Sequence, residues 1–286
     1  MTQMNPEKIP TTKIAAWVGR DRWARRAWFA AGPAVPPDLR PFAVTLLSLL
    51  ACVSTPLLRA TDAAPRVFMA GDSTMANKPA DLPEYGWGQA LPRFFSDPAM
   101  IHNHAVNGRS TKSFIDEGRW QKIVDELHAG DFVIIQFGHN DEKIEDAKRG
   151  TDPKTTFSDN LRRFIREVRA KEASPILATP VCRRSFRPPG KLRDTHGAYP
   201  DALRAVATEE NVPLLDLQRA TAQWLENVGD EPSKQFFMWI EPGKFEQLPQ
   251  GAQDNTHFGE SGAVHVAGLA VAQMREQKLP LAQWLK

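Results

Sequence analysis

The sequence contains only two cysteines, Cys52 and Cys182. Cys52 lies in an apolar stretch that we expect to be removed, which leaves Cys182 alone in the folded part. An internal disulfide is then impossible, so the folded part must be stable through its hydrophobic core. A catalytic Cys182 is the less favoured alternative, because a lone thiol is more often a small buried hydrophobe.

An excess of charge is also lacking, since 36 lysines and arginines stand against 34 acidic residues for a net charge of +2. The overall charge therefore does not indicate a nucleic-acid partner. Cysteine pairs of metal-site spacing are missing too, so we expect no metal and no cofactor. A metal site built from Asp254, His257 and His265 is a weak alternative.

Residues 1–64 have the pattern of an N-terminal leader. Arginines between positions 20 and 26 precede an apolar run from Pro41 to Leu58, and small residues follow it. This order predicts an export signal, and hence a secreted or periplasmic protein with no stable membrane insertion after processing. With 42% hydrophobic residues, the remaining segment 65–286 is long enough for one catalytic domain.

Three further interpretations concern this leader. A start codon near Val35 or Leu39 would explain why the leader is long ahead of its apolar run. A permanent membrane anchor is an alternative, although an interrupted run of this length is marginal for spanning a bilayer. Leu49–Cys52 also resembles a bacterial lipoprotein cleavage box, in which Cys52 would carry the lipid.

From Pro65 onward, apolar segments alternate with amphipathic ones, which predicts a parallel sheet covered by helices on both faces. Two long connections, Pro180–Pro200 and Asn227–Asp254, are expected to be lids or binding loops. The predicted strands are Val67–Ala70, Ile101–Val106, Phe132–Phe137, Pro175–Thr179 and Val212–Leu217. The predicted helices are Trp87–Phe95, Trp120–Leu127, Phe157–Ala170, Asp201–Glu210 and Gly259–Gln277.

The segment Val67–Met75 begins with four apolar residues and continues through Gly71, Asp72 and Ser73. This pattern predicts a buried strand that ends in a turn opening a helix. Such a turn would place Ser73 at the carboxyl end of the strand, where ligands of open α/β sheets bind. We therefore predict Ser73 as a nucleophile. In the alternative interpretation, Gly71 only turns the chain and Asp72 or Ser73 caps the helix.

A serine nucleophile needs a positioned base, and the base needs a group that fixes its tautomer. His257 and Asp254 can supply both, because Asp254 lies three residues before His257 and one tight turn can direct both side chains to the same surface. Acyl transfer also needs donors for the oxyanion, for which Gly108 and Asn140 follow two other predicted strands. Each of these residues could instead serve ordinary loop or capping chemistry.

Four segments of the chain resemble the sequence blocks of the SGNH (GDSL) hydrolase superfamily, and more narrowly of the rhamnogalacturonan acetylesterase-like carbohydrate esterases. The likeness extends from about Val67 to the C-terminus, and no block departs from the pattern. Segments 85–88 and 179–184 are also similar to the pectin-related branch. The four blocks are Gly71–Met75, Asn107–Ser110, Gly138–Asp141 and Asp254–Phe258.

This resemblance implies that Ser73 is the nucleophile, His257 its base and Asp254 the residue that orients the base. It implies an oxyanion hole made of the Ser73 and Gly108 backbone N–H groups and the Asn140 side chain. It further implies a flavodoxin-like three-layer α/β/α sandwich with a parallel five-stranded sheet, and no metal.

The expected substrate is an acetylated polysaccharide or oligosaccharide. A basic loop after Thr179 would suit a polyuronate, because arginine can bind carboxylates with two hydrogen bonds. The alternative is a loop whose charges are merely solvated. The predicted substrate-binding residues are Trp87, Arg109, Arg183, Arg184 and Arg187.

The sequence thus predicts a serine esterase that removes O-acetyl groups from a plant cell-wall polysaccharide, with pectic rhamnogalacturonan favoured. Another SGNH activity is the first alternative: an acetylxylan esterase, arylesterase or lysophospholipase. A non-catalytic module that holds phosphate or carbohydrate at residues 71–74 is the second. The acetylated sugar and the oligomeric state are not indicated by the sequence.

Overall fold

The computed structural model describes residues 64–286, so the predicted export signal, its alternatives and Cys52 lie outside the described residues. The main sheet has five parallel strands in the order β3-β1-β4-β5-β8. This order confirms the flavodoxin-like fold, in which the first strand lies inside the sheet. The strands are β1 (Val67–Gly71), β3 (Ile101–Asn103), β4 (Phe132–Gln136), β5 (Ser174–Ala178) and β8 (Leu214–Leu215).

Both faces of this sheet are apolar, because alternate residues of each strand point to opposite sides. In β1, Val67 and Met69 contribute to one core cluster, whereas Phe68 and Ala70 contribute to the other. Each of these four side chains is fully buried. Fully burying a large apolar side chain stabilises the fold by about 1.5–3 kcal/mol, so the two clusters can stabilise residues 64–286, which contain Cys182 as a free cysteine and no disulfide.

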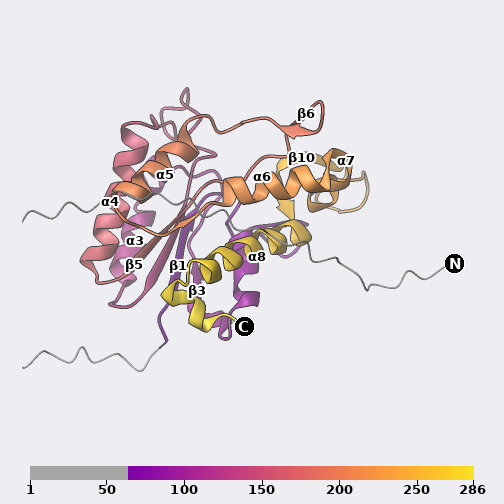
Figure 1. The fold of residues 1–286 in the computed structure, drawn as a ribbon. Helices are drawn as coiled ribbons and strands as arrows, with labels where there is room; N and C mark the ends of the chain where they lie inside the picture. Colours follow the sequence, from indigo (N-terminus) through magenta and orange to yellow (C-terminus); the bar gives the residue numbers. More distant parts are fainter. Residues whose placement is uncertain (1–63) are drawn as a thin grey trace, which may run out of the picture. The chain divides into compact units, whose positions relative to one another are not determined.

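Helices cover both faces of the sheet, as predicted (Figure 1). The helices against the first cluster are α1 (Trp87–Ala90), α6 (Leu217–Val228) and α8 (Glu260–Glu276). Those against the second are α2 (Thr111–Asp116), α3 (Arg119–Glu126), α4 (Thr156–Ala170) and α5 (Tyr199–Glu209).

Helix α6 differs from the prediction, which extended a strand to Leu217. The strand β8 ends at Leu215, and Asp216 caps α6 by accepting a hydrogen bond from the backbone N–H of Arg219 at 3.4 Å. Leu217, Thr221 and Leu225 are buried at four-residue spacing. The cap residue and the four-residue spacing are typical of a helix that begins at Leu217. The prediction extended the strand because Leu217 continues the apolar run of residues 212–215.

A second, antiparallel sheet was not predicted at all. Its three strands lie in the order β2-β10-β9, and β2 comes from a part of the sequence distant from the other two strands. It occupies part of the connection that was expected to be a long loop, which also holds the short helix α7 (Asp230–Ser233). The other long connection holds a hairpin of β6 (Phe186–Arg187) and β7 (Lys191–Leu192). The strands of the second sheet are β2 (Glu84–Tyr85), β9 (Phe237–Ile240) and β10 (Ala252–Gly259).

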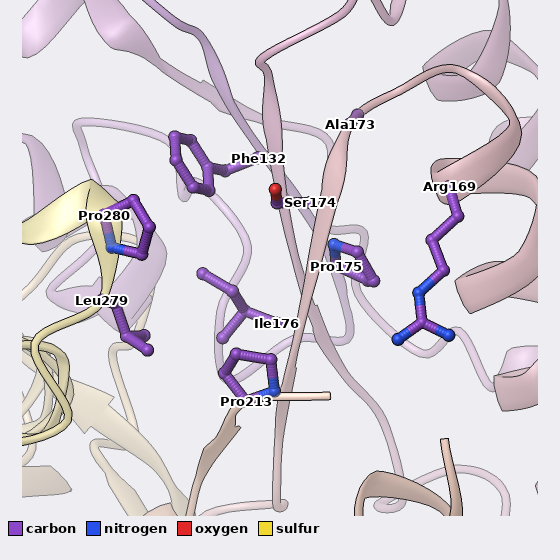
Figure 2. A pocket seen from close by; sticks show the side chains of 9 residues that line it. All are labelled: Phe132, Arg169, Ala173, Ser174, Pro175, Ile176, Pro213, Leu279 and Pro280. Atoms are coloured by element: carbon purple, nitrogen blue, oxygen red, sulfur yellow. The ribbon is translucent and has the colours of Figure 1, made fainter. Parts of the chain in front are cut away.

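A hollow of about 380 Å³ lies where β4 and β5 begin, at the amino edge of the main sheet (Figure 2). Apolar side chains and three prolines form most of its wall. The guanidinium of Arg169 donates to the backbone carbonyl of Glu210 at 2.7 Å. The lining residues are Phe132, Arg169, Ala173, Ser174, Pro175, Ile176, Pro213, Leu279 and Pro280.

No helix among residues 64–286 is both long enough and apolar enough to cross a membrane.

Candidate active site

Ser73 lies in the turn that directly follows β1, and its side chain is partly exposed. The backbone N–H groups of Met75 and Ala76 donate to the carbonyl of Asp72 at 3.2 and 3.0 Å, which closes one helical turn. The predicted helix does not continue from this turn, because Pro79 lacks a backbone N–H and restricts the residue before it. The turn still leaves Ser73 at the carboxyl edge of the sheet.

Asp72 fixes this turn from inside the protein. Its Oδ1 accepts hydrogen bonds from the Thr74 backbone N–H at 2.9 Å and the Thr74 hydroxyl at 2.8 Å. Its Oδ2 lies 3.1 Å from Nδ1 of His139. Burial raises the pKa of Asp72, but the charge and hydrogen bond of His139 and the bonds from Thr74 outweigh burial and lower it to about 2. Burial lowers the pKa of His139, against the charge and hydrogen bond of Asp72.

His257 and Asp254 reach the nucleophile from β10. Nε2 of His257 lies 2.8 Å from Oγ of Ser73, and Nδ1 of His257 lies 2.6 Å from Oδ2 of Asp254. The other carboxylate oxygen of Asp254 accepts from the backbone N–H groups of Thr256 at 2.6 Å and His257 at 3.1 Å. Burial raises the pKa of Asp254, but the His257 hydrogen bond and the backbone donors lower it to about 2. Asp254 therefore stays ionised and can hold a proton on Nδ1 of His257.

The second sheet explains how two residues of an expected loop obtain fixed positions. Phe258 pairs with Tyr85 of β2 and Phe237 of β9, while the register shifts between Gln253 and Phe258. The irregular part of β10 lies at Asp254–His257, where the Asp254 carboxylate accepts from the backbone N–H groups of Thr256 and His257.

The segment that carries Gly108 runs beside β1 beyond the end of β3. Backbone N–H groups of His104 and Val106 donate to the carbonyls of Met69 and Gly71 at 2.9 and 3.0 Å. Gly108 has φ of 76°, in the left-handed region that favours glycine. The backbone at Gly108 is thus held next to the strand that leads to Ser73.

Asn140 follows β4, and its side chain is nearly fully buried. One N–H of its carboxamide donates to the backbone carbonyl of Arg109 at 3.1 Å. The glycine block and the asparagine block are therefore in contact, as an oxyanion hole requires.

Asp141, the last residue of the asparagine block, bonds Thr111, which directly follows the glycine block. Its carboxylate accepts from the backbone N–H of Thr111 at 3.1 Å, from the Thr111 hydroxyl at 2.5 Å and from the Thr151 hydroxyl at 3.0 Å. Burial raises the pKa of Asp141 to about 7, although these hydrogen bonds act in the opposite direction. Sequence reasoning gave Asp141 no role beyond its motif, because its partners are 30 and 10 residues away.

Two of the predicted substrate-binding residues are not available to a substrate. Trp87 is fully buried, and its indole N–H donates to Gln136 Oε1 at 2.5 Å. Arg184 is 5% exposed, forms an ion pair with Asp230 and lies over the ring of Trp239 at 4.9 Å. Both predictions are corrected, because a buried side chain offers no surface for a sugar.

The other three predicted substrate-binding residues are more accessible. Arg183 forms an ion pair with Glu142, and Arg109 bonds Glu117 at 3.0 Å, so both guanidinium groups already have an acidic partner. Arg187 is exposed on β6 and has no acidic partner among the described residues.

The alternatives that involve Cys182 and His265 find no support in the geometry. Cys182 is buried, burial raises its pKa to about 11, and its Sγ lies 3.2 Å from the carbonyl of Gln218. His265 stacks on Trp224 at 4.2 Å in α8 and does not join Asp254 and His257. Residues 64–286 hold no group of three or more His, Cys, Asp or Glu that could bind a metal ion.

Three comparisons with known proteins complete the description of the site. The model of the GDSL-like Lipase/Acylhydrolase family matches residues 69–263. Rhamnogalacturonan acetylesterase RhgT of Bacillus subtilis is 43% identical over 221 residues, which cover 77% of this chain and 94% of RhgT. Probable rhamnogalacturonan acetylesterase YesY of the same species is 34% identical over 223 residues, which cover 77% of this chain and 97% of YesY. The crystal structure of B. subtilis YxiM matches with a TM-score of 0.65 and 27% sequence identity. The match covers 76% of this chain and 58% of the YxiM chain.

Proposed function

The chain belongs to the GDSL-like lipase/acylhydrolase family and is a carboxylic ester hydrolase, and from this premise we propose that it removes O-acetyl groups from a plant cell-wall polysaccharide. The observation that carries the proposal is the hydrogen-bonded series from Ser73 Oγ through His257 to Asp254. RhgT and YesY, whose names give rhamnogalacturonan acetylesterase activity, support pectic rhamnogalacturonan as the polymer.

In the proposed reaction, Nε2 of His257 takes the proton of Ser73 while Oγ attacks the acetyl carbonyl carbon. The resulting tetrahedral oxyanion accepts hydrogen bonds from the backbone N–H groups of Ser73 and Gly108 and from Asn140. His257 then gives its proton to the sugar oxygen, which leaves an acetyl group on Ser73. Water, deprotonated by His257, releases acetate by the same route. The ionised Asp254 stabilises the imidazolium in both halves of the reaction.

The substrate part of the proposal concerns the surface around this site. Arg187 and Arg193 are exposed in the loop between β5 and α5, and neither has an acidic partner among the described residues. Exposed guanidinium groups without an internal partner are free to bind the carboxylates of a polyuronate. We assign these two arginines, in place of Arg184, to contacts along the polymer.

The leader remains part of the proposal as well. We expect residues 1–64 to direct export and to be removed, so that the mature protein begins near Ala64 or Pro65. Mass-spectrometric analysis of the N-terminus of protein from the native host tests this. Soluble enzyme that retains Met1 contradicts it, and a lipid on Cys52 would favour the lipoprotein alternative.

The activity itself is tested with acetylated pectin, acetylxylan and an aryl acetate, each assayed for released acetate or phenol. We expect the highest kcat/KM on acetylated pectin and none on any substrate for Ser73→Ala. A serine-reactive phosphonate should label Ser73 in the wild type. Equal efficiency on the two polymers would remove the support for a pectic substrate, and absence of labelling would favour a binding module.

A further inference from the structure

Two cationic side chains lie on the carbonyl side of the Asn140 carboxamide. Nζ of Lys143 donates to Oδ1 of Asn140 at 3.1 Å, and Nη1 of Arg149 donates to the same oxygen at 3.4 Å. The amide nitrogen on the opposite side donates one N–H to the Arg109 carbonyl. An amide group has two N–H bonds, so one remains for an oxyanion.

The loop that carries both cations is closed tightly. The backbone N–H groups of Arg149 and Gly150 donate to the carbonyl of Asp146 at 2.9 and 2.6 Å. A Cβ at Gly150 would lie only 2.7 Å from the carbonyl oxygen of Lys143, so the two ends of the loop meet backbone to backbone. This closure holds Arg149 beside Asn140, and Nη1 of Arg149 would lie 3.9 Å from a Cβ at Gly108.

We propose that Lys143 and Arg149 are positioning residues that hold the Asn140 carboxamide with its N–H facing the oxyanion and polarise it. A carboxamide can rotate by half a turn, which would exchange its donor and acceptor sides. Two cations at Oδ1 exclude that rotation, because an N–H facing them would be repelled. They also draw electron density toward Oδ1, which strengthens the remaining N–H as a donor.

The charges around Lys143 agree with a role toward Asn140. Arg149 has Asp146 as an acidic partner at 2.7 Å, whereas Lys143 has no ion pair among the described residues. Burial, and then the charges of Arg149 and Arg183, lower the pKa of Lys143. The nearby carboxylate of Glu142 is already bonded by His196 at 2.9 Å and by Arg183. Lys143 therefore has the Asn140 carbonyl as its polar partner.

The inference rests on the proposed function, since it assigns a role through an oxyanion donor. The experiment measures kcat and KM on a neutral aryl acetate for Lys143→Met and Arg149→Met, alone and combined with Asn140→Ala. We expect each single variant to lose about 3- to 10-fold in kcat with KM nearly unchanged, the size of one hydrogen bond. In the Asn140→Ala background the same substitutions should have almost no effect, because the group they act on is gone. Lys143→Arg should restore most of the lost kcat.

Lys148→Met is the matched control, since Lys148 is an exposed cation of the same loop without a bond to Asn140. Its kcat should equal that of the wild type. Equal losses with and without Asn140 would overturn the proposal, and a loss confined to KM on acetylated pectin would assign the two cations to substrate binding instead. Failure of the proposed function is distinguishable, because the wild type would then show no Ser73-dependent ester hydrolysis.

Discussion

The two edges of the main sheet carry opposite kinds of surface. At the carboxyl edge, turns after β1 and β4 bring together buried polar groups, among them Asp72, His139 and Asp141. At the amino edge, the hollow in Figure 2 is lined mainly by apolar side chains and prolines. Arg169 is the one charged residue in the lining of the amino-edge hollow, so the hollow holds no pair of titratable groups.

In this fold the candidate active site is marked by its side-chain chemistry and not by the hollow. Parallel strands all end at one edge, so residues that follow different strands meet there. Buried titratable groups with opposite pKa shifts lie at that edge: Asp72 at about 2 and Asp141 at about 7. Perturbed pKa values of this kind cluster at functional sites.

The largest expected effect is at the carboxyl edge itself. Ser73→Ala and His257→Ala should each abolish turnover of an aryl acetate, and the double variant should be scarcely worse, because these residues act as a unit. Steady-state and single-turnover kinetics measure this. Substantial activity in either variant, or activity that depends on added Zn²⁺, would contradict the assignment of the nucleophile and base.

The next effect concerns the oxyanion. Asn140→Ala should fold normally and lose about 10²–10³ in kcat with a nearly unchanged KM, because a donor that acts in the transition state is removed. Turnover within a few-fold of the wild type would mean that Asn140 serves only the loop.

A smaller effect is expected on the outer surface of the same edge. Replacing Arg187 and Arg193 with glutamine should raise KM for acetylated pectin several-fold, since each exposed charge contact contributes about 0.2–1 kcal/mol. kcat/KM for a neutral aryl acetate should not change, and added salt should have the same effect as the substitutions. Equal losses on both substrates would show that the loop shapes the site itself.

The pKa shift of Asp141 predicts how stability depends on pH. Its pKa is raised from 3.8 to about 7 in the folded protein, so the folded state holds this proton more tightly than the unfolded chain does. The contribution of the protonated Asp141 carboxyl to the free energy of unfolding is fully present below pH 3.8. It is lost as pH rises toward 7. The neutral carboxamide of Asp141→Asn should remove this loss. The pKa of His139 is lowered by burial and gives the opposite trend, so the measured quantity is the Tm difference between wild type and variant at pH 4 to 7. A constant difference would contradict the shift.

The smallest effect on activity is expected at the amino edge. Ile176→Val enlarges the hollow by one methylene and should reduce the free energy of unfolding by about 0.5–1.5 kcal/mol. Denaturant unfolding measures this, and kcat should equal that of the wild type. A changed kcat would mean that packing at the amino edge affects the active site. That result would contradict the separation of the two edges.

The sequence predicted the elements whose signal is local. The apolar run of β1, the stripe of α4 and the Gly-Asp-Ser turn could be read because period and turn residues lie within a few positions of each other. The second sheet could not be read, because β2 has two residues and pairs with β10 more than 160 positions away. A two-residue strand is too short to show an alternating pattern, and β10 has only one fully buried residue to mark it as a strand.

The sequence by itself determined the functional groups that we propose for ester hydrolysis, since the side-chain chemistry of Ser73, His257 and Asn140 is a property of the residues and of their motifs. Only the tertiary structure decided which arginines remain free, because the burial of Arg184 depends on Asp230 and Trp239, which lie more than 40 residues further along the chain. It likewise decided the opposite pKa shifts of Asp72 and Asp141. A side chain carries its functional group from the sequence, but its solvent, its partners and its charge state come from what folds against it.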